Sequence, residues 1–183
     1  LQTGLLTEPK GFLGSSVSGA YGDLDNSDTL FSGLQIFHET DNFYTTGSLF
    51  YGKTDTNFKK QGLISSLDNF KSSAFSVGLF SKKGFGEYDS FGFQIDQPLR
   101  LEKGRMDLSI PVGRTKSRVV LFEEYSMSVA PTGRELDFKL IYNWPFSSGL
   151  LSSRIGYIKD SNHFSNQEDQ LYFATNIEFR LSE

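Results

Sequence analysis

The sequence predicts an all-β fold, an antiparallel up-and-down β-barrel-like domain of about 8–12 strands. In most segments apolar and polar side chains alternate with a period of two, as they do in strands that bury one face. No segment sustains the helical period of about 3.6 residues. Of the 183 residues, 18 are Phe, 8 are Tyr and 18 are Gly, whereas hydrophobic residues make up only 37%, a balance that favours sheets.

The alternation begins after a short stretch without periodicity. We therefore predict a lead-in segment at residues 1–14 and a single antiparallel β-barrel domain at residues 15–183. Polar clusters at 23–28 and 39–42 are predicted to be turns between the first strands. The polar interval 53–71 has no clear pattern, so it is predicted to be a long loop, which in a domain of this size is usually functional or mobile.

Residues 91–112, in the middle of the chain, show the alternation of apolar and polar residues that the other segments follow. Phe91, Phe93 and Ile95 alternate with polar or small residues, a charged cluster follows at 102–105, and the alternation resumes at 106–112. Two antiparallel strands joined by a turn at 102–105 account for this order.

Segments 136–144 and 171–181 have one apolar side and one charged side. The apolar side faces lipid in a membrane barrel and the core in a soluble β domain, and periodicity fits both. Its predicted members are Leu136, Phe138, Leu140, Tyr142, Trp144, Leu171, Phe173, Ile177 and Phe179. The charged side faces the lumen or the solvent, and its predicted members are Asp137, Lys139, Glu178 and Arg180.

Composition excludes several classes of function. The formal net charge is -4 with no basic stripe, so a nucleic-acid partner is not expected. Cys is 0 and His is 2, so we expect no disulfide, no metal site and no cofactor. No apolar run is long enough for a transmembrane helix, but transmembrane strands of about 9–11 residues leave little trace in average hydropathy.

One cluster invites a catalytic interpretation, because Asp160, Ser161 and His163 lie close together in the sequence. Catalytic triads depend on geometry, and the sequence contains no nucleophile signature such as G-x-S-x-G. The cluster is more typical of a turn, so we predict no catalytic residue and no enzymatic activity in this chain.

From residue 75 onward the order of residues is more specific than simple alternation. The pieces Gln97-Pro98-Leu99-Arg100, Gly104-Arg105, Pro111-Val112, 131–135 and Asn162-His163 resemble the C-terminal region that follows the protease domain in some subtilisin-like serine peptidases of Gram-negative bacteria. The resemblance covers about the last 110 residues well and the first 70 loosely.

This resemblance implies a non-catalytic, autotransporter-like β-barrel that anchors or translocates an upstream protease domain at the outer membrane or cell surface. Its expected partners are the lipid bilayer or the outer-membrane assembly machinery and the upstream protease domain. The alternative is a soluble β-sandwich or barrel module at the cell surface that binds a partner or self-associates. A third interpretation, a small β-barrel enzyme that uses His163, lacks a supporting constellation.

Overall fold

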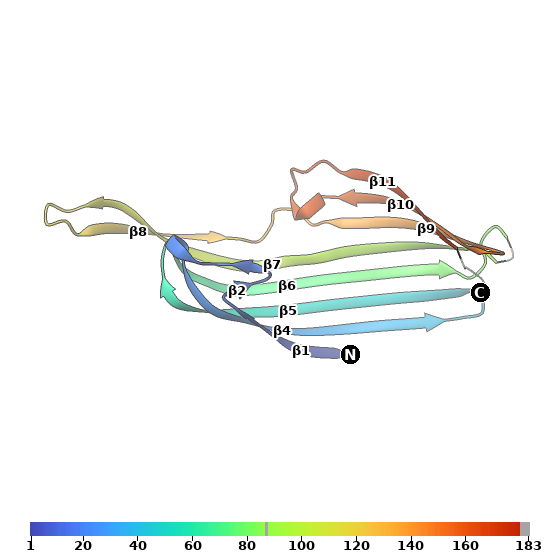
Figure 1. Cartoon of the computed structure of the whole chain (residues 1–183), viewed down its shortest axis with the longest axis horizontal. Coiled ribbons are helices and arrows are strands. Elements are labelled where there is room, and N and C mark those ends of the chain that lie inside the picture. The colour runs from blue at the N-terminus through green and yellow to red at the C-terminus, as the bar shows by residue number, and fades with distance from the viewer. Residues whose placement is uncertain (87, 180–183) are drawn as a thin grey trace.

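The computed structural model describes residues 1–86 and 88–179 and consists almost entirely of strands (Figure 1). The large sheet contains nine antiparallel strands: β1 (Gln2–Pro9), β4 (Gly22–Glu39), β5 (Phe43–Gln61), β6 (Ile64–Ser81), β7 (Ser90–Arg114), β8 (Val120–Ser128), β9 (Leu136–Phe146), β10 (Gly149–Lys159) and β11 (Gln170–Phe179). The small elements are β2 (Gly11–Phe12), β3 (Ser15–Ser16) and the 3-10 turns η1 (Gly19–Tyr21) and η2 (Ser161–His163).

The large sheet is open. Its strand order is β1-β4-β5-β6-β7-β9-β10-β11, and β8 pairs with β7 outside this path. The predicted all-β, antiparallel, up-and-down architecture is confirmed, but within the described residues β1 and β11 are edges that do not pair with each other. The alternation of residues determines which side chains share a face of a strand. Closure of the sheet into a barrel also depends on strand number, tilt and shear, and alternation carries no information about these.

The predicted loop at 53–71 is wrong, because β5 and β6 run through it and are joined at 62–63. Most residues of β5 in this segment are polar on both faces. On β6 the buried Ile64, Leu67 and Phe70 recur every third residue, because register shifts interrupt its ladder with β7. Thr54, only 1% exposed, shares a hydrogen bond of 2.8 Å with Thr29 on β4. The polar segment is therefore held by cross-strand pairs, which leave no apolar alternation in the sequence.

The predicted turn at 102–105 is also wrong, since β7 runs without interruption for 25 residues. The charged residues that resembled a turn are paired with β6. Arg105 forms an ion pair of 2.6 Å with Asp68, and Glu102 accepts a hydrogen bond of 2.6 Å from Ser73. Gly104 is needed for packing, because a Cβ there would lie 2.7 Å from the ring of Phe70.

β7 changes partners along its length. It pairs with β9 from Ser90 to Asp96 and with β8 from Arg105 to Arg114, while β6 lies along its other side as far as Leu108. The β7–β8 hairpin consequently projects beyond the ends of the other strands (Figure 1).

β1 occupies most of the segment predicted as a lead-in, and the chain after it folds back over one face of the sheet. The Glu8 carboxylate accepts hydrogen bonds of 2.9 Å from the backbone N–H groups of Leu13 and Gly14, which fixes the turn between β2 and β3. The ring of Phe12 then lies 4.3 Å from that of Phe70. This contact belongs to a small core built on Ile64, Leu67 and Phe70.

Candidate membrane-facing surface and polar face

One face of the large sheet carries rows of apolar side chains that cross the strands. In one row Leu79 is the partner of Phe93, Phe93 of Leu140, Leu140 of Ile155, and Ile155 of Phe173. The row therefore continues across β6, β7, β9, β10 and β11 without a polar side chain.

Neighbouring rows extend this surface across the sheet, and we call it the apolar band. Its members are between 41% and 78% exposed, and they are Leu30, Leu34, Ile36, Leu49, Tyr51, Val77, Leu79, Phe91, Phe93, Leu140, Trp144, Ile155, Tyr157, Leu171, Phe173, Ile177 and Phe179. Among the described residues, no second layer covers the band. An exposed apolar surface that spans several strands marks an interaction with lipid or with another protein.

The sequence predicted part of this band. Leu140, Trp144, Leu171, Phe173, Ile177 and Phe179 belong to it, and the half-buried Leu136, Phe138 and Tyr142 share its side of β9. The band members on β4 to β7 and on β10 were not among the predicted residues. On β4 apolar residues occupy both alternating sets, so the sequence did not assign its orientation. Of the residues predicted for the charged side, Asp137, Lys139 and Glu178 occupy the opposite positions, whereas Arg180 lies outside the described residues.

The opposite face is polar and more closely packed. Lys139 Nζ lies 2.6 Å from a carboxylate oxygen of Asp96 and 2.9 Å from one of Asp137, and all three side chains are less than 20% exposed. Gln94 donates a hydrogen bond of 2.8 Å to Asp96. One cation is thus held between two carboxylates on the polar face of the sheet.

Small residues let aromatic rings lie flat on this polar face. A side chain at Gly92 would overlap the ring of Phe80, and one at Gly156 would overlap Tyr172. Each ring covers the backbone of the neighbouring strand, a pairing of aromatic residue and glycine that stabilises curved sheets.

Three of the sequence pieces named above, 97–100, 131–135 and 162–163, meet beside β7, where β9 begins and β10 is joined to β11. Gly104-Arg105 instead contacts β6, and Pro111-Val112 lies on the β7–β8 hairpin. The Arg100 guanidinium donates hydrogen bonds of 2.9 Å to the carbonyl oxygens of Gly133 and Pro131 and forms an ion pair of 2.6 Å with Glu102. Burial raises the pKa of Glu102, but hydrogen bonds from Ser73 and Arg134 and the charges of Arg134 and Arg100 outweigh it, so its pKa lies below the ordinary value.

His163 completes this cluster through backbone contacts. Its Nδ1 accepts the N–H of Glu135 at 2.9 Å, and its Nε2 lies 3.1 Å from the carbonyl oxygen of Leu99. Nδ1 accepts and Nε2 donates, so the imidazole is neutral with its proton on Nε2. The hydroxyl of Ser161 instead accepts hydrogen bonds from Asn162 and Gln170. The arrangement is a structural clamp between β7 and two loops.

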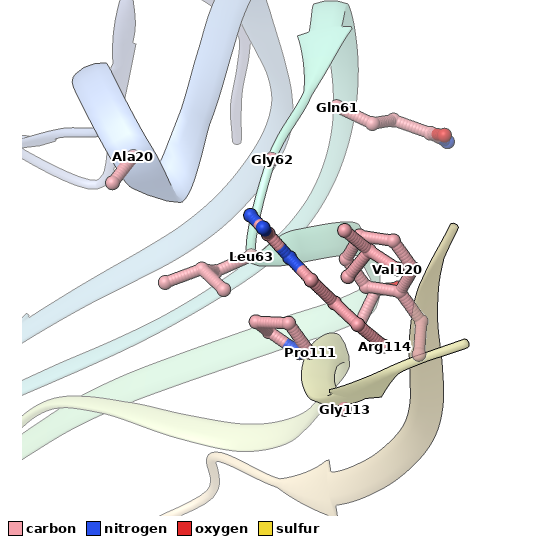
Figure 2. A pocket seen from close by; sticks show the side chains of 10 residues that line it. Ala20, Gln61, Gly62, Leu63, Pro111, Gly113, Arg114 and Val120 are labelled. Carbon is pink, nitrogen blue, oxygen red and sulfur yellow. The ribbon is translucent and has the colours of Figure 1, made fainter. Parts of the chain in front are cut away.

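An open pocket of about 780 Å³ lies where the β7–β8 hairpin leaves the sheet. Figure 2 shows the side chain of Arg114 extending across it towards Gly62 and Leu63, with Pro111 and Val120 on the hairpin side. Among residues 1–86 and 88–179 there is no group of three or more metal-ligating side chains. In the same residues, no helix has the length and apolar character needed to cross a membrane.

Comparisons with known proteins found no matching family model, no matching curated protein and no matching solved structure.

Proposed function

We propose that this chain is an autotransporter-like β domain that anchors or translocates an upstream subtilisin-like protease domain at the outer membrane of a Gram-negative bacterium. The observation that carries the proposal is the apolar band. In a water-soluble sheet protein such a face would be buried in a core, whereas here its side chains are exposed and the core is a small cluster elsewhere in the molecule.

The height of the band fits a bilayer. On β5, β9 and β11 every second residue lies on the side of the apolar band over a stretch of nine residues (43–51, 136–144 and 171–179). At about 3.3 Å per residue and a tilt of about 45°, nine residues rise about 21 Å, close to the apolar band of about 25 Å in outer-membrane barrels.

The polar face fits the lumen of such a barrel. Lys139 neutralises the charge of Asp96 and is itself held by Asp137, so charged groups face away from the lipid and are paired. Membrane strands alternate in this way, with apolar residues outward and polar residues inward.

The two ends of the sheet differ as outer-membrane domains do. At one end β9 and β10 are joined by residues 147–148 and β4 and β5 by residues 40–42. In the longer connection at this end, Asp89 accepts hydrogen bonds from the N–H groups of Phe85 and Gly86 and from the hydroxyl of Tyr142. At the other end residues 62–63 make a short connection between β5 and β6, but β10 and β11 are joined by residues 160–169 and the β7–β8 hairpin projects (Figure 1), as the longer extracellular segments do.

The proposal requires that the edges β1 and β11 be paired in the membrane, because unpaired backbone groups are not tolerated in hydrocarbon. The path from β1 to β11 contains eight strands of alternating direction, so its two edges are antiparallel to each other. Either direct pairing of β1 with β11 or the insertion of an even number of further strands would complete an antiparallel barrel.

Trp144, the single tryptophan and a member of the band, provides the test. The chain is refolded in the presence of lipid vesicles that contain brominated acyl chains, and Trp144 fluorescence is expected to be quenched. The matched control is the double variant Asn143→Trp/Trp144→Phe, which moves the indole to the polar face and should escape most of the quenching. A folded chain in plain buffer whose Trp144 is unaffected by these vesicles would overturn the proposal and favour the soluble partner-binding or self-associating module.

A further inference from the structure

One edge of β8 has no partner strand among the described residues. Among the described residues β8 pairs only with β7, so its other side presents unpaired backbone groups. The hairpin projects beyond its neighbours (Figure 1), and a two-stranded ribbon is only marginally stable by itself. An exposed edge of this kind is a template for an additional strand.

The hydrogen bonds at the two ends of the hairpin show which amides point outward. The N–H of Val129 donates to the carbonyl of Gly104 at 3.1 Å, and the N–H of Thr115 donates to Val119 at 2.9 Å. Along an antiparallel strand, the N–H groups of successive residues point to opposite sides. The N–H groups of the odd-numbered residues of β8 therefore point to β7. The N–H groups of Phe122, Glu124 and Ser126 therefore point to the free edge.

The side chains of the hairpin define what an added strand would meet. On one face Tyr125 and Met127 pair with Leu108 and Met106 and form an apolar strip, which ends at Glu123, the acceptor of a hydrogen bond from the Tyr125 hydroxyl. A strand beside this face would need apolar side chains.

The other face of the hairpin is acidic. Glu124 and Ser126 lie beside Asp107 in a pocket of about 430 Å³ that Ser65 and Ser66 also line. Asp107 accepts a hydrogen bond of 2.6 Å from Ser66, and the hydrogen bonds from Ser66 and Ser126 and the charge of Arg105 keep its pKa below the ordinary value. The pocket thus retains negative charge at neutral pH and fits a basic side chain.

A second copy of this chain fits the edge poorly. Glu124 is the central residue of β8, so a symmetric pairing of the whole strand with a second β8 sets two glutamates opposite each other. Like charges directly opposite destabilise a strand pair.

We propose that the free edge of β8 binds an extended segment of a partner protein in which basic side chains alternate with apolar ones. The basic side chains lie over Glu124 and Asp107, and the apolar side chains lie beside Tyr125 and Met127. The inference does not depend on the membrane proposal, because β8 lies outside the apolar band.

The test uses a fluorescent peptide of alternating lysine and valine, titrated with the full chain and followed by anisotropy. Ser126→Pro removes one outward N–H and leaves the ladder to β7 intact, so we expect binding about fivefold weaker. Ser126→Val keeps this N–H and loses only the hydroxyl beside Asp107, so it should bind more tightly than Ser126→Pro. Glu124→Lys should weaken binding by about tenfold, and an alternating glutamate and valine peptide should not bind. No binding to the unmodified chain, or equal binding by Ser126→Pro and Ser126→Val, overturns the proposal.

A second measurement covers the case in which Ser126→Pro does not fold. In the unmodified chain the peptide should slow hydrogen exchange at the amides of Phe122, Glu124 and Ser126, while the amides of Glu123 and Tyr125, already paired with β7, should change little. Protection elsewhere in the chain, or protection that appears on self-association without peptide, contradicts the proposal and assigns the edge to another occupant.

Discussion

The imidazole of His163 accepts the backbone N–H of Glu135 through Nδ1 at 2.9 Å, which joins two segments 28 residues apart. Its Nε2 lies 3.1 Å from the carbonyl oxygen of Leu99 on β7, so the 3-10 turn η2 in the β10–β11 connection links the start of β9 to the long central strand. The side chain is buried, and both of its nitrogens are used.

We predict that His163→Ala lowers the free energy of unfolding by about 1–3 kcal/mol, because the Glu135 N–H and the Leu99 carbonyl lose their partner in a buried site. Urea unfolding followed by circular dichroism measures the change. His38→Ala is the matched control, since the side chain of His38 is exposed, and it should shift stability by less than about 0.5 kcal/mol. If both substitutions change the free energy of unfolding equally, the hydrogen bonds of His163 do not stabilise the fold.

Lys139 between Asp96 and Asp137 gives a second prediction. Lys139→Met should destabilise the fold by about 2–3 kcal/mol, because two partly buried carboxylates then face each other without a cation. Adding Asp96→Asn and Asp137→Asn to Lys139→Met should restore most of the loss. If the triple variant is no more stable than Lys139→Met, the loss comes from packing, not from charge.

The lowered pKa of Glu102 predicts a pH dependence. A carboxylate whose pKa is lower in the folded than in the unfolded chain stabilises the fold above its ordinary pKa of 4.5, and this contribution is lost as the pH falls through the folded value. The unmodified chain should therefore exceed Glu102→Gln in stability at pH 7, and the gap should narrow as the pH falls below about 4.5. Urea midpoints at several pH values test this, and a gap that does not change with pH would contradict it.

The alternation of apolar and polar residues predicted the all-β class and the two sides of 136–144 and 171–179, because a strand exposes alternate residues to opposite faces whatever its neighbours are. It failed at 53–71 and 102–105, and also at 23–28, where the predicted turn lies within β4. There the stabilising pairs join different strands, such as Thr29 with Thr54 and Arg105 with Asp68, and neither strand alone shows them.

The alternation of residues could not predict the cluster around His163 either, because its contacts also join different strands. His163 and Leu99 are 64 residues apart, and their contact exists only once β7 has paired with β9 and β9 with β10. Three of the pieces that carry the resemblance, 97–100, 131–135 and 162–163, meet there through Arg100 and His163. Periodicity describes single strands, so it could not indicate these contacts.

The membrane proposal predicts a difference between two adjacent residues of β9. Leu140, in the apolar band, would face lipid, and Lys139 faces the polar side. Leu140→Arg should reduce stability in phospholipid vesicles by about 2–4 kcal/mol, because the guanidinium would be buried in hydrocarbon, whereas Lys139→Arg keeps its charge beside Asp96 and should change stability little. Equilibrium urea titrations of the chain folded in vesicles, followed by Trp144 fluorescence, measure both. A Leu140→Arg variant that is as stable as Lys139→Arg would show that this face of β9 does not contact the bilayer.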